Sequence, residues 1–298
     1  MSPLRKTGAF TAALTAAFAA AYGLGSAVAP VDGGRAQETA HASMTDDDGH
    51  AAQEPTAHTP GGLQVTENGY TLDLGTTSLP AGARTTLRFV VRDAEGAPVT
   101  AYRTEHGTQL HLIVASRELT AYRHLHPTRA ADGTWSTPVE LSEAGGYRVF
   151  ADFTPAAARE GLTLGSDLAV TGSYAAHTLP SPATTTTVDG YTVRLDGALA
   201  PGRKSDLTFT VSRAGRPVTP LEPYLGAHGH LVALRAGDLA YLHVHPHEEV
   251  KGTTPSGPEV TFTATTPTPG TYRLFLDFKV AGRVHTAAFT TTTTGQRH

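Results

Sequence analysis

Short segments in which apolar and polar residues alternate follow one another along residues 63–295. Gly and Pro turns separate them at intervals of about 8 to 15 residues. Alternation with a period of two directs one set of side chains into a core and the other into solvent, as in a half-buried β-strand. No stretch of convincing length has the apolar spacing of an amphipathic helix. The pattern predicts an all-β chain built from antiparallel β-sandwiches.

The series of segments occurs twice, with a period of roughly 120 residues. Asn68–Leu72 (NGYTL) returns as Asp189–Val193 (DGYTV), and Gly145–Phe153 returns as Gly270–Phe278. We therefore expect two tandem immunoglobulin-like β-sandwich domains. The predicted organisation is a signal peptide or membrane anchor at 1–30, a disordered linker at 31–62, the first sandwich at 63–177, a Pro/Thr-rich linker at 178–187 and the second sandwich at 188–295.

The N-terminal segment predicts export. Arg5 and Lys6 precede an uncharged, Ala-rich run of 22 residues from Gly8 to Ala29. That length is close to the ~20 residues that span a bilayer, and Ala-Val-Ala at its end resembles a cleavage site that Pro30 would disfavour. A membrane anchor and a cleaved signal both stay open, and in either case we expect an extracytoplasmic protein. The predicted disordered linker carries His and Asp residues that could bind a metal weakly.

Composition narrows the chemistry. The chain has no Cys and only 2 Met, so disulfides and thiolate ligands are excluded and a soft Cu(I) site is disfavoured. The formal net charge of −4 gives no indication of a nucleic-acid partner. The 15 His residues are the remaining candidates for chemistry.

The histidines repeat in the same arrangement in both halves of the chain. In each half, thirteen positions separate one His from a His-x-His-Pro motif, and a Tyr stands two places before that motif. Imidazole is the commonest metal ligand in proteins, so a duplicated three-His pattern predicts metal binding. The candidate ligands are His111, His124 and His126 in the first repeat and His230, His243 and His245 in the second.

A hairpin register suggests how the ligands would meet. With a two-residue tip at Arg117-Glu118, His111 lies opposite His124; with a tip at Ala236-Gly237, the matching pair of the second repeat is opposed in the same way. The third His lies two places further along on the same face. The sequence thus predicts one three-His cluster for each hairpin, at the mouth of its sandwich. Histidines at the edge of a core also serve as structural hydrogen-bonding groups, and this interpretation stays open.

Further polar residues accompany these clusters. Asp152 and Asp277 occupy matching places in the two Tyr-Arg-x-Phe-x-Asp-Phe segments, where they could accept a hydrogen bond from the non-ligating nitrogen of a nearby His. His228 and His247 are additional candidates in the second repeat. This higher density of His makes the second cluster the stronger candidate.

The motifs also carry a family resemblance. The pattern His-Leu…Ala-Tyr-x-His-x-His-Pro…Gly-x-Tyr-Arg-x-Phe-x-Asp-Phe resembles a largely uncharacterised family of bacterial secreted or membrane-anchored proteins. It is loosely similar to the immunoglobulin-like copper-binding domains of the CopC/YtkA kind. The resemblance covers both repeats and implies an extracytoplasmic sandwich with a role in copper or heavy-metal handling. The N-terminal His and Met-rich segments of CopC-type domains have no counterpart here.

Three functions are compared on these grounds. The first is an extracytoplasmic transition-metal-binding protein, with Cu(II) as the expected ion and Zn or Ni as weaker alternatives, because all-nitrogen sites follow this order of affinity. The second is a structural or interaction module of the cell envelope in which the His are structural. The third, an enzyme, is disfavoured. Gly237, His243, His245 and Glu249 mimic part of a cupin motif, but no second motif follows and no nucleophile has a partnered base.

Overall fold

The computed structural model describes residues 59–242, 244–247 and 257–293. The predicted signal or anchor segment, His243 and nearly all of the predicted disordered linker lie outside the described residues. Both sandwiches belong to one compact unit. In the part of the chain that is described, no helix has the length and apolar character needed to cross a membrane.

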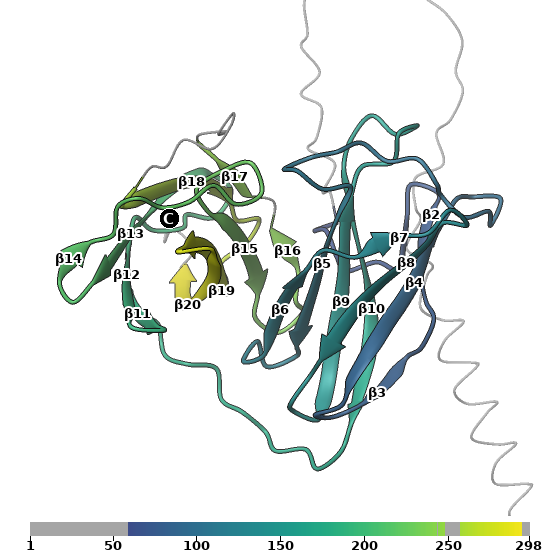
Figure 1. Ribbon diagram of the computed structural model, residues 1–298, viewed down its shortest axis with the longest axis horizontal. Helices are drawn as coiled ribbons and strands as arrows, with labels where there is room; N and C mark the ends of the chain where they lie inside the picture. The colour runs from purple at the N-terminus through teal and green to yellow at the C-terminus, as the bar shows by residue number, and fades with distance from the viewer. Residues whose placement is uncertain (1–58, 243, 248–256, 294–298) are drawn as a thin grey trace, which may run out of the picture. The chain divides into compact units, whose positions relative to one another are not determined.

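The first repeat forms two five-stranded sheets (Figure 1). One has the order β1-β2-β4-β8-β7 and the other has the order β3-β10-β9-β5-β6. Alternation produces the strands as predicted: in β4, Leu87, Phe89 and Val91 are buried while Arg88 is exposed. The strands are β1 (Thr66–Glu67), β2 (Tyr70–Leu74), β3 (Ser78–Pro80), β4 (Arg84–Arg92), β5 (Leu110–Ser116), β6 (Tyr122–Leu125), β7 (Thr128–Arg129), β8 (Thr134–Glu140), β9 (Gly145–Phe153) and β10 (Leu162–Thr171).

The second repeat has the same plan. Its sheets have the orders β11-β12-β13-β18-β17, with β14 added on β13, and β16-β15-β19-β20. The strands are β11 (Thr185–Val188), β12 (Tyr191–Asp196), β13 (Lys204–Arg213), β14 (Arg216–Pro217), β15 (His230–Arg235), β16 (Tyr241–Leu242), β17 (Val244–Pro246), β18 (Glu259–Thr265), β19 (Gly270–Val280) and β20 (Arg283–Thr293).

Two details identify the sandwiches as immunoglobulin-like. In the first repeat β3 pairs in parallel with β10, while the other strand pairs are antiparallel, so the chain switches sheets along its first strands. Each repeat also has a tyrosine corner: Tyr147 donates its hydroxyl to the Glu143 carbonyl at 2.9 Å, and Tyr272 donates to the Thr268 carbonyl at 2.6 Å. The prediction of two tandem immunoglobulin-like sandwiches is confirmed.

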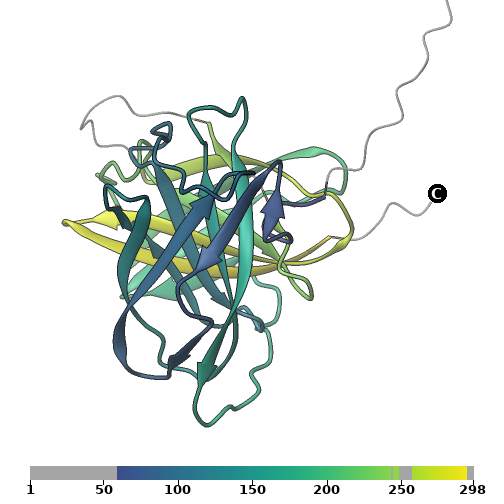
Figure 2. The same cartoon turned by 90° about the vertical axis from the view of Figure 1, so that its right-hand side faces the viewer.

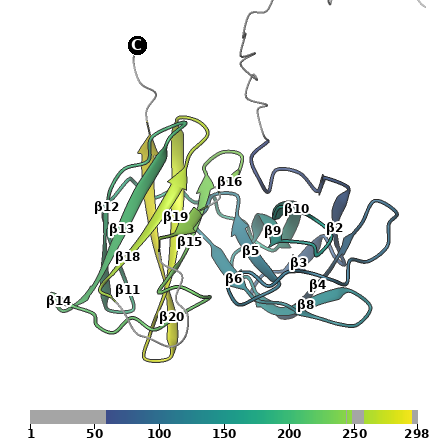
Figure 3. The ribbon, with the colours of Figure 1, turned by 90° about the horizontal axis from the view of Figure 1, so that it is seen from above.

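A third hydrophobic core joins the two repeats in addition to the core inside each sandwich. It lies between the sheet that contains β5, β6 and β9 and the sheet that contains β15, β16 and β19 (Figure 3). Every residue of β5 is buried, because one face of the strand packs inside its own sandwich and the other packs against the second repeat. Five residues come from each repeat: Ile113, Ala115, Leu119, Tyr122 and Phe150 from the first, and Val232, Leu234, Leu239, Tyr241 and Phe275 from the second.

The contacts in this shared core are reciprocal. The rings of Tyr122 and Phe275 stack with centroids 4.0 Å apart and planes 7° apart. The matching rings, Tyr241 and Phe150, lie 5.8 Å apart. Each repeat therefore offers the same patch to the other, the arrangement of an isologous dimer interface within one chain. Figure 2 gives a second view of the strands that surround it.

The predicted hairpin register is wrong by two residues. In the first repeat Ile113, not His111, is the direct partner of His124. The turn is longer than the expected two-residue tip, because Ser116 donates its main-chain N–H to the Ala121 carbonyl and Leu119 adopts a positive φ of 57°. The second repeat is shifted in the same way, with Leu234 opposite Tyr241. A shift of two positions keeps each side chain on its predicted face.

Candidate metal centre

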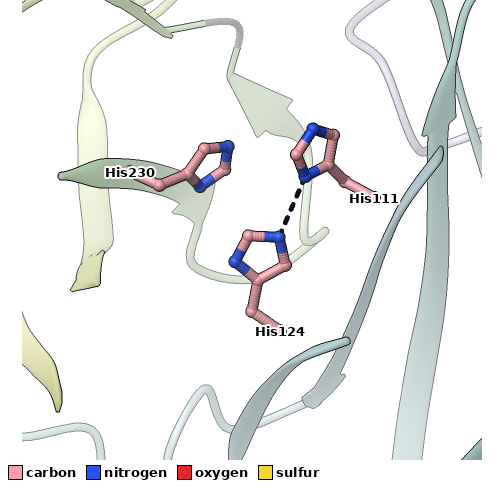
Figure 4. A group of neighbouring side chains, drawn as sticks. All are labelled: His111, His124 and His230. Atoms are coloured by element: carbon pink, nitrogen blue, oxygen red, sulfur yellow. Dashed lines mark hydrogen bonds between the residues drawn. The ribbon is translucent and has the colours of Figure 1, made fainter. Parts of the chain in front are cut away.

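Three imidazoles converge where the two sandwiches meet (Figure 4). His111 comes from β5, His124 from β6 and His230 from the start of β15. One nitrogen of each ring lies within 4.8 Å of the corresponding nitrogens of the other two. The two repeats therefore contribute to one shared cluster, which corrects the prediction of a separate cluster on each hairpin.

A chain of hydrogen bonds fixes the central ring. His124 Nδ1 lies 2.8 Å from Asp277 Oδ2, and the side chains of both residues are almost completely buried. The other oxygen of Asp277, Oδ1, accepts a hydrogen bond of 2.5 Å from Thr286 Oγ1. A carboxylate only accepts hydrogen bonds, so the proton of His124 belongs on Nδ1, and the lone pair of Nε2 faces His111 Nδ1, which lies 3.1 Å away.

The spacing of two of the ring nitrogens fits shared coordination. His111 Nδ1 lies 3.1 Å from His124 Nε2. Two nitrogens this far apart, each at the usual ~2.05 Å from one ion, would subtend about 100° at the ion, between square and tetrahedral angles. The His230 ring stacks on that of His111 with centroids 5.0 Å apart, and its centroid lies 4.6 Å from that of His124. One nitrogen of each of the three rings lies within 4.8 Å of the others, whereas two nitrogens on one ion lie at most about 4.1 Å apart, so the rings must move closer to share an ion.

Burial favours the neutral form of the His111 and His230 rings. It lowers the pKa of His111 to about 3, and repulsion from the neighbouring imidazoles of His124 and His126 acts in the same direction. The same causes, burial first, lower the pKa of His230 well below its usual range. His111 Nε2 and His230 Nδ1 are buried with no hydrogen bond of good geometry to another described residue. A neutral imidazole with an unused lone pair is the form that binds a metal ion.

His126 lies beside the cluster on the solvent side. Its side chain is exposed, and its ring centroid lies 4.8 Å from that of His124 and 5.8 Å from that of His111. Burial of part of the ring and the nearby His124 lower the pKa of His126 to about 4. His126 is thus a neighbour of the three converging rings, but it is not one of the three residues whose ring nitrogens lie within 4.8 Å of one another.

Two residues that the motif did not include also border the cluster. His106, at the tip of a tight turn before β5, has its ring 6.3 Å from that of His111. Tyr224 lies 6.0 Å from the His126 ring, and burial together with the charge of Asp277 raises the pKa of its hydroxyl. The only signal for His106 in the sequence is that it precedes His111 by five positions. Nothing in the sequence indicates Tyr224.

The second repeat does not reproduce the first around its His-x-His-Pro motif. β16 pairs with β15, but β17 pairs with β18 in the opposite sheet, where the backbone of His245 lies opposite Thr263. The predicted position of His245 along the hairpin of His230 is therefore wrong, because the chain changes sheets directly after β16.

The remaining candidates lie in other places. His228 is buried and, with His247, lines a cavity of about 330 Å³. His247 is exposed, and its Nε2 lies 2.6 Å from Thr263 Oγ1 and 3.1 Å from Asp206 Oδ1. Asp152 accepts a hydrogen bond of 2.9 Å from Thr163 Oγ1. In the ladder Asp152 is the partner of His111, just as Asp277 is the partner of His230.

Cavities adjoin the cluster on two sides. His111 and His230 line one of about 120 Å³, together with His106 and Arg103. His124 and Asp277 line another, of about 470 Å³. A site with three protein ligands and adjoining space differs from a closed, four-ligand structural site, because it leaves a position for a further ligand.

Comparisons with known proteins define the family. A family model described as "Domain of unknown function (DUF8832)" matches residues 64–163 and 186–295, one segment in each sandwich. No curated protein sequence matches the chain.

Solved structures of low similarity include bacterial surface proteins. FdeC, an Escherichia coli adhesin, is 19% identical with a TM-score of 0.24, over 77% of this chain and 65% of that one. Invasin, a bacterial integrin-binding protein, is 14% identical with a TM-score of 0.24, over 77% and 41%. Domains 4 and 5 of the S-layer protein SbsC are 14% identical with a TM-score of 0.24, over 78% and 100%. The chain spans less than two thirds of the FdeC chain that it matches.

Proposed function

Because the chain belongs to the DUF8832 family, with one copy of the domain in each sandwich, we propose a function for the tandem pair as a unit. We propose an extracytoplasmic, non-enzymatic module of the bacterial cell envelope. Its two sandwiches are held together by a shared core, and it binds one divalent transition-metal ion between them. Its expected partners are the metal ion and the membrane, which it contacts through the N-terminal segment.

The convergence of His111, His124 and His230 carries the metal part of this proposal. These rings come from both repeats, burial lowers the pKa of His111 and of His230, and Asp277 holds the non-ligating nitrogen of His124. Carboxylate–imidazole pairs of this kind orient metal-binding histidines and raise their basicity.

Cu(II) is the ion that we expect, with Zn and Ni as weaker alternatives. All three accept imidazole nitrogen, and Cu(II) binds most tightly to a given set of donors. The chain has no Cys to shift the preference toward softer ions. The loose resemblance to CopC/YtkA-like domains favours the same ion.

A second candidate is a structural or interaction module in which the histidines bind no metal. The hydrogen bond between His111 Nδ1 and His124 Nε2 favours it, because it already satisfies both nitrogens within the first repeat. The hydrogen bond from His124 to Asp277 then links the two repeats without an ion. The shared hydrophobic core would hold the sandwiches together without an ion.

Equilibrium dialysis of the purified full chain against Cu(II) or Zn(II), followed by elemental analysis, separates the two candidates. The metal-binding function predicts about one tightly bound ion per chain at neutral pH, and its loss in both His124→Ala and His230→Ala. His177→Ala is the matched control, since the His177 side chain is 45% exposed and the residue lies after the end of β10 and before β11. If no near-stoichiometric ion is bound and the two cluster variants alter only stability, the structural module is the correct function.

A further inference from the structure

The three converging imidazoles are shielded from solvent. His111 is 5% exposed, the His124 side chain is 3% exposed, and Nδ1 of His230 is buried. An aqueous ion carries its own water ligands and must exchange them for imidazole nitrogens before it can lie among these rings. An imidazole that is exposed to solvent could bind the hydrated ion first and begin this exchange.

His126 is placed to do so. Among the described histidines around the cluster, His126 is exposed, whereas His106 is half-buried. Its ring is close to perpendicular to both buried rings, at 71° to that of His124 and 80° to that of His111. Its ring centroid lies 4.8 Å from that of His124 and 5.8 Å from that of His111, so the exposed imidazole is a direct neighbour of both buried rings.

We propose that His126 is the capture ligand of the site: its imidazole binds the incoming divalent ion at the surface and then remains as an exchangeable fourth ligand once His111, His124 and His230 hold the ion. This inference rests on the metal-binding function proposed above and deepens it. In each exchange one metal–water bond is broken and one metal–nitrogen bond is formed, with no change in oxidation state. The ion loses its water stepwise, and the chain needs no opening of the shared core.

The consequence is a division of roles. The three buried rings determine whether the ion is held, and the exposed ring determines how fast it arrives and leaves. A site of this kind passes its ion to an acceptor more readily than a closed four-ligand site does, because one coordination position is already accessible.

Stopped-flow mixing of the full chain with Cu(II), and release of bound Cu(II) to excess chelator, test the assignment. His126→Ala is expected to slow both association and release by roughly tenfold, the scale on which a partner of a metal site acts. The stoichiometry at equilibrium should stay at one ion. The electron paramagnetic resonance spectrum should change from that of the wild-type protein, because a water replaces a nitrogen. His177→Ala should match the wild type in all four measurements.

Each outcome is decisive. If the wild type binds Cu(II) and His126→Ala has unchanged rates and an unchanged spectrum, the capture role is overturned while the metal-binding function stands. If folded His126→Ala loses the ion altogether, His126 is a permanent ligand and the exchangeable role is overturned. If the wild type binds no ion, the metal-binding function fails, and this inference fails with it.

Discussion

His124 of the first repeat is held by Asp277 of the second, with 2.8 Å between Nδ1 and Oδ2 and both side chains almost fully buried. The residues are 153 positions apart in the chain. The carboxylate fixes the proton of the imidazole on Nδ1 and also links the two sandwiches. One contact thus serves both the proposed metal centre and the stability of the docked pair.

Replacing Asp277 by Asn should weaken both roles. The neutral amide accepts a weaker hydrogen bond than the carboxylate and raises the basicity of His124 less, so we expect Cu(II) affinity to fall about 10- to 100-fold. Loss of a hydrogen bond to a charged group should reduce the free energy of unfolding by about 1.5–3 kcal/mol. Competition titration and urea unfolding measure the two effects. Asp196→Asn, at an exposed carboxylate, should change neither; unchanged affinity in Asp277→Asn would contradict the orienting role.

The reciprocal ring contacts make a prediction about the shared core. Phe275 stacks on Tyr122, and Phe150 contacts Tyr241, so truncating either Phe opens a cavity between the sandwiches. We expect Phe275→Ala and Phe150→Ala each to lower the free energy of unfolding by about 3–5 kcal/mol. Val284→Ala, at a side chain that is 43% exposed, should stay within about 0.5 kcal/mol of the wild type. A cost near zero for either Phe variant in urea unfolding would show that the two repeats do not pack in this way.

Alternation along the chain was sufficient to predict the fold. In β4 the buried Leu87, Phe89 and Val91 alternate with polar neighbours, and this local pattern reports directly which face points into the sandwich. The repetition of these segments predicted two domains because each segment keeps its place in the same topology. Both conclusions rest on patterns that can be read along the chain: the local alternation within each strand and its recurrence after about 120 residues.

The contact between the two repeats could not be predicted from the sequence. The fully buried β5 reads as a continuous apolar run, which indicates burial of both faces but does not indicate what covers the second. The register of each hairpin was missed because Leu119 and Leu239 adopt positive φ, a conformation that the sequence signals clearly only with Gly or Asn. The arrangement of the candidate site depends on both the docking and the register, because His111 and His124 lie beside His230 of the other repeat.

Gly62 has a close approach that only glycine allows. Its φ is 75°, and a Cβ at this position would lie 2.5 Å from Phe150 Cδ1 and 3.2 Å from Tyr241 Cβ, both in the shared core. Gly62→Ala should therefore cost about 1–2 kcal/mol for backbone strain and about 1–3 kcal/mol more for overpacking.

Gly82 separates the two contributions. Its φ is similar, at 70°, but a Cβ there has no atom within 4 Å, so Gly82→Ala should show the backbone cost alone. Thermal and urea unfolding of both variants give the difference. Equal destabilisation would mean that Gly62 is not wedged against the shared core.

The buried histidines predict how the metal-free protein responds to acid. Burial and neighbouring imidazoles lower the pKa of folded His111 to about 3, against about 6.5 in the unfolded chain. Between about pH 6.5 and 3, the unfolded state therefore binds a proton at His111 that the folded state does not bind. Stability is fully present above about pH 6.5 and is lost as the pH falls from there toward 3, and His230, whose pKa is also lowered, adds to the loss.

Melting temperatures of chelator-treated protein between pH 7.5 and 4 should show this decline before the carboxylates titrate. His177→Ala should decline in parallel with the wild type, since the ring removed is exposed. His111→Gln should flatten the curve between pH 6.5 and 5 even if it starts from a lower melting temperature, because it removes one of the groups that must gain a proton. A wild-type melting temperature that is constant over this range would contradict the burial of neutral imidazoles between the two sandwiches.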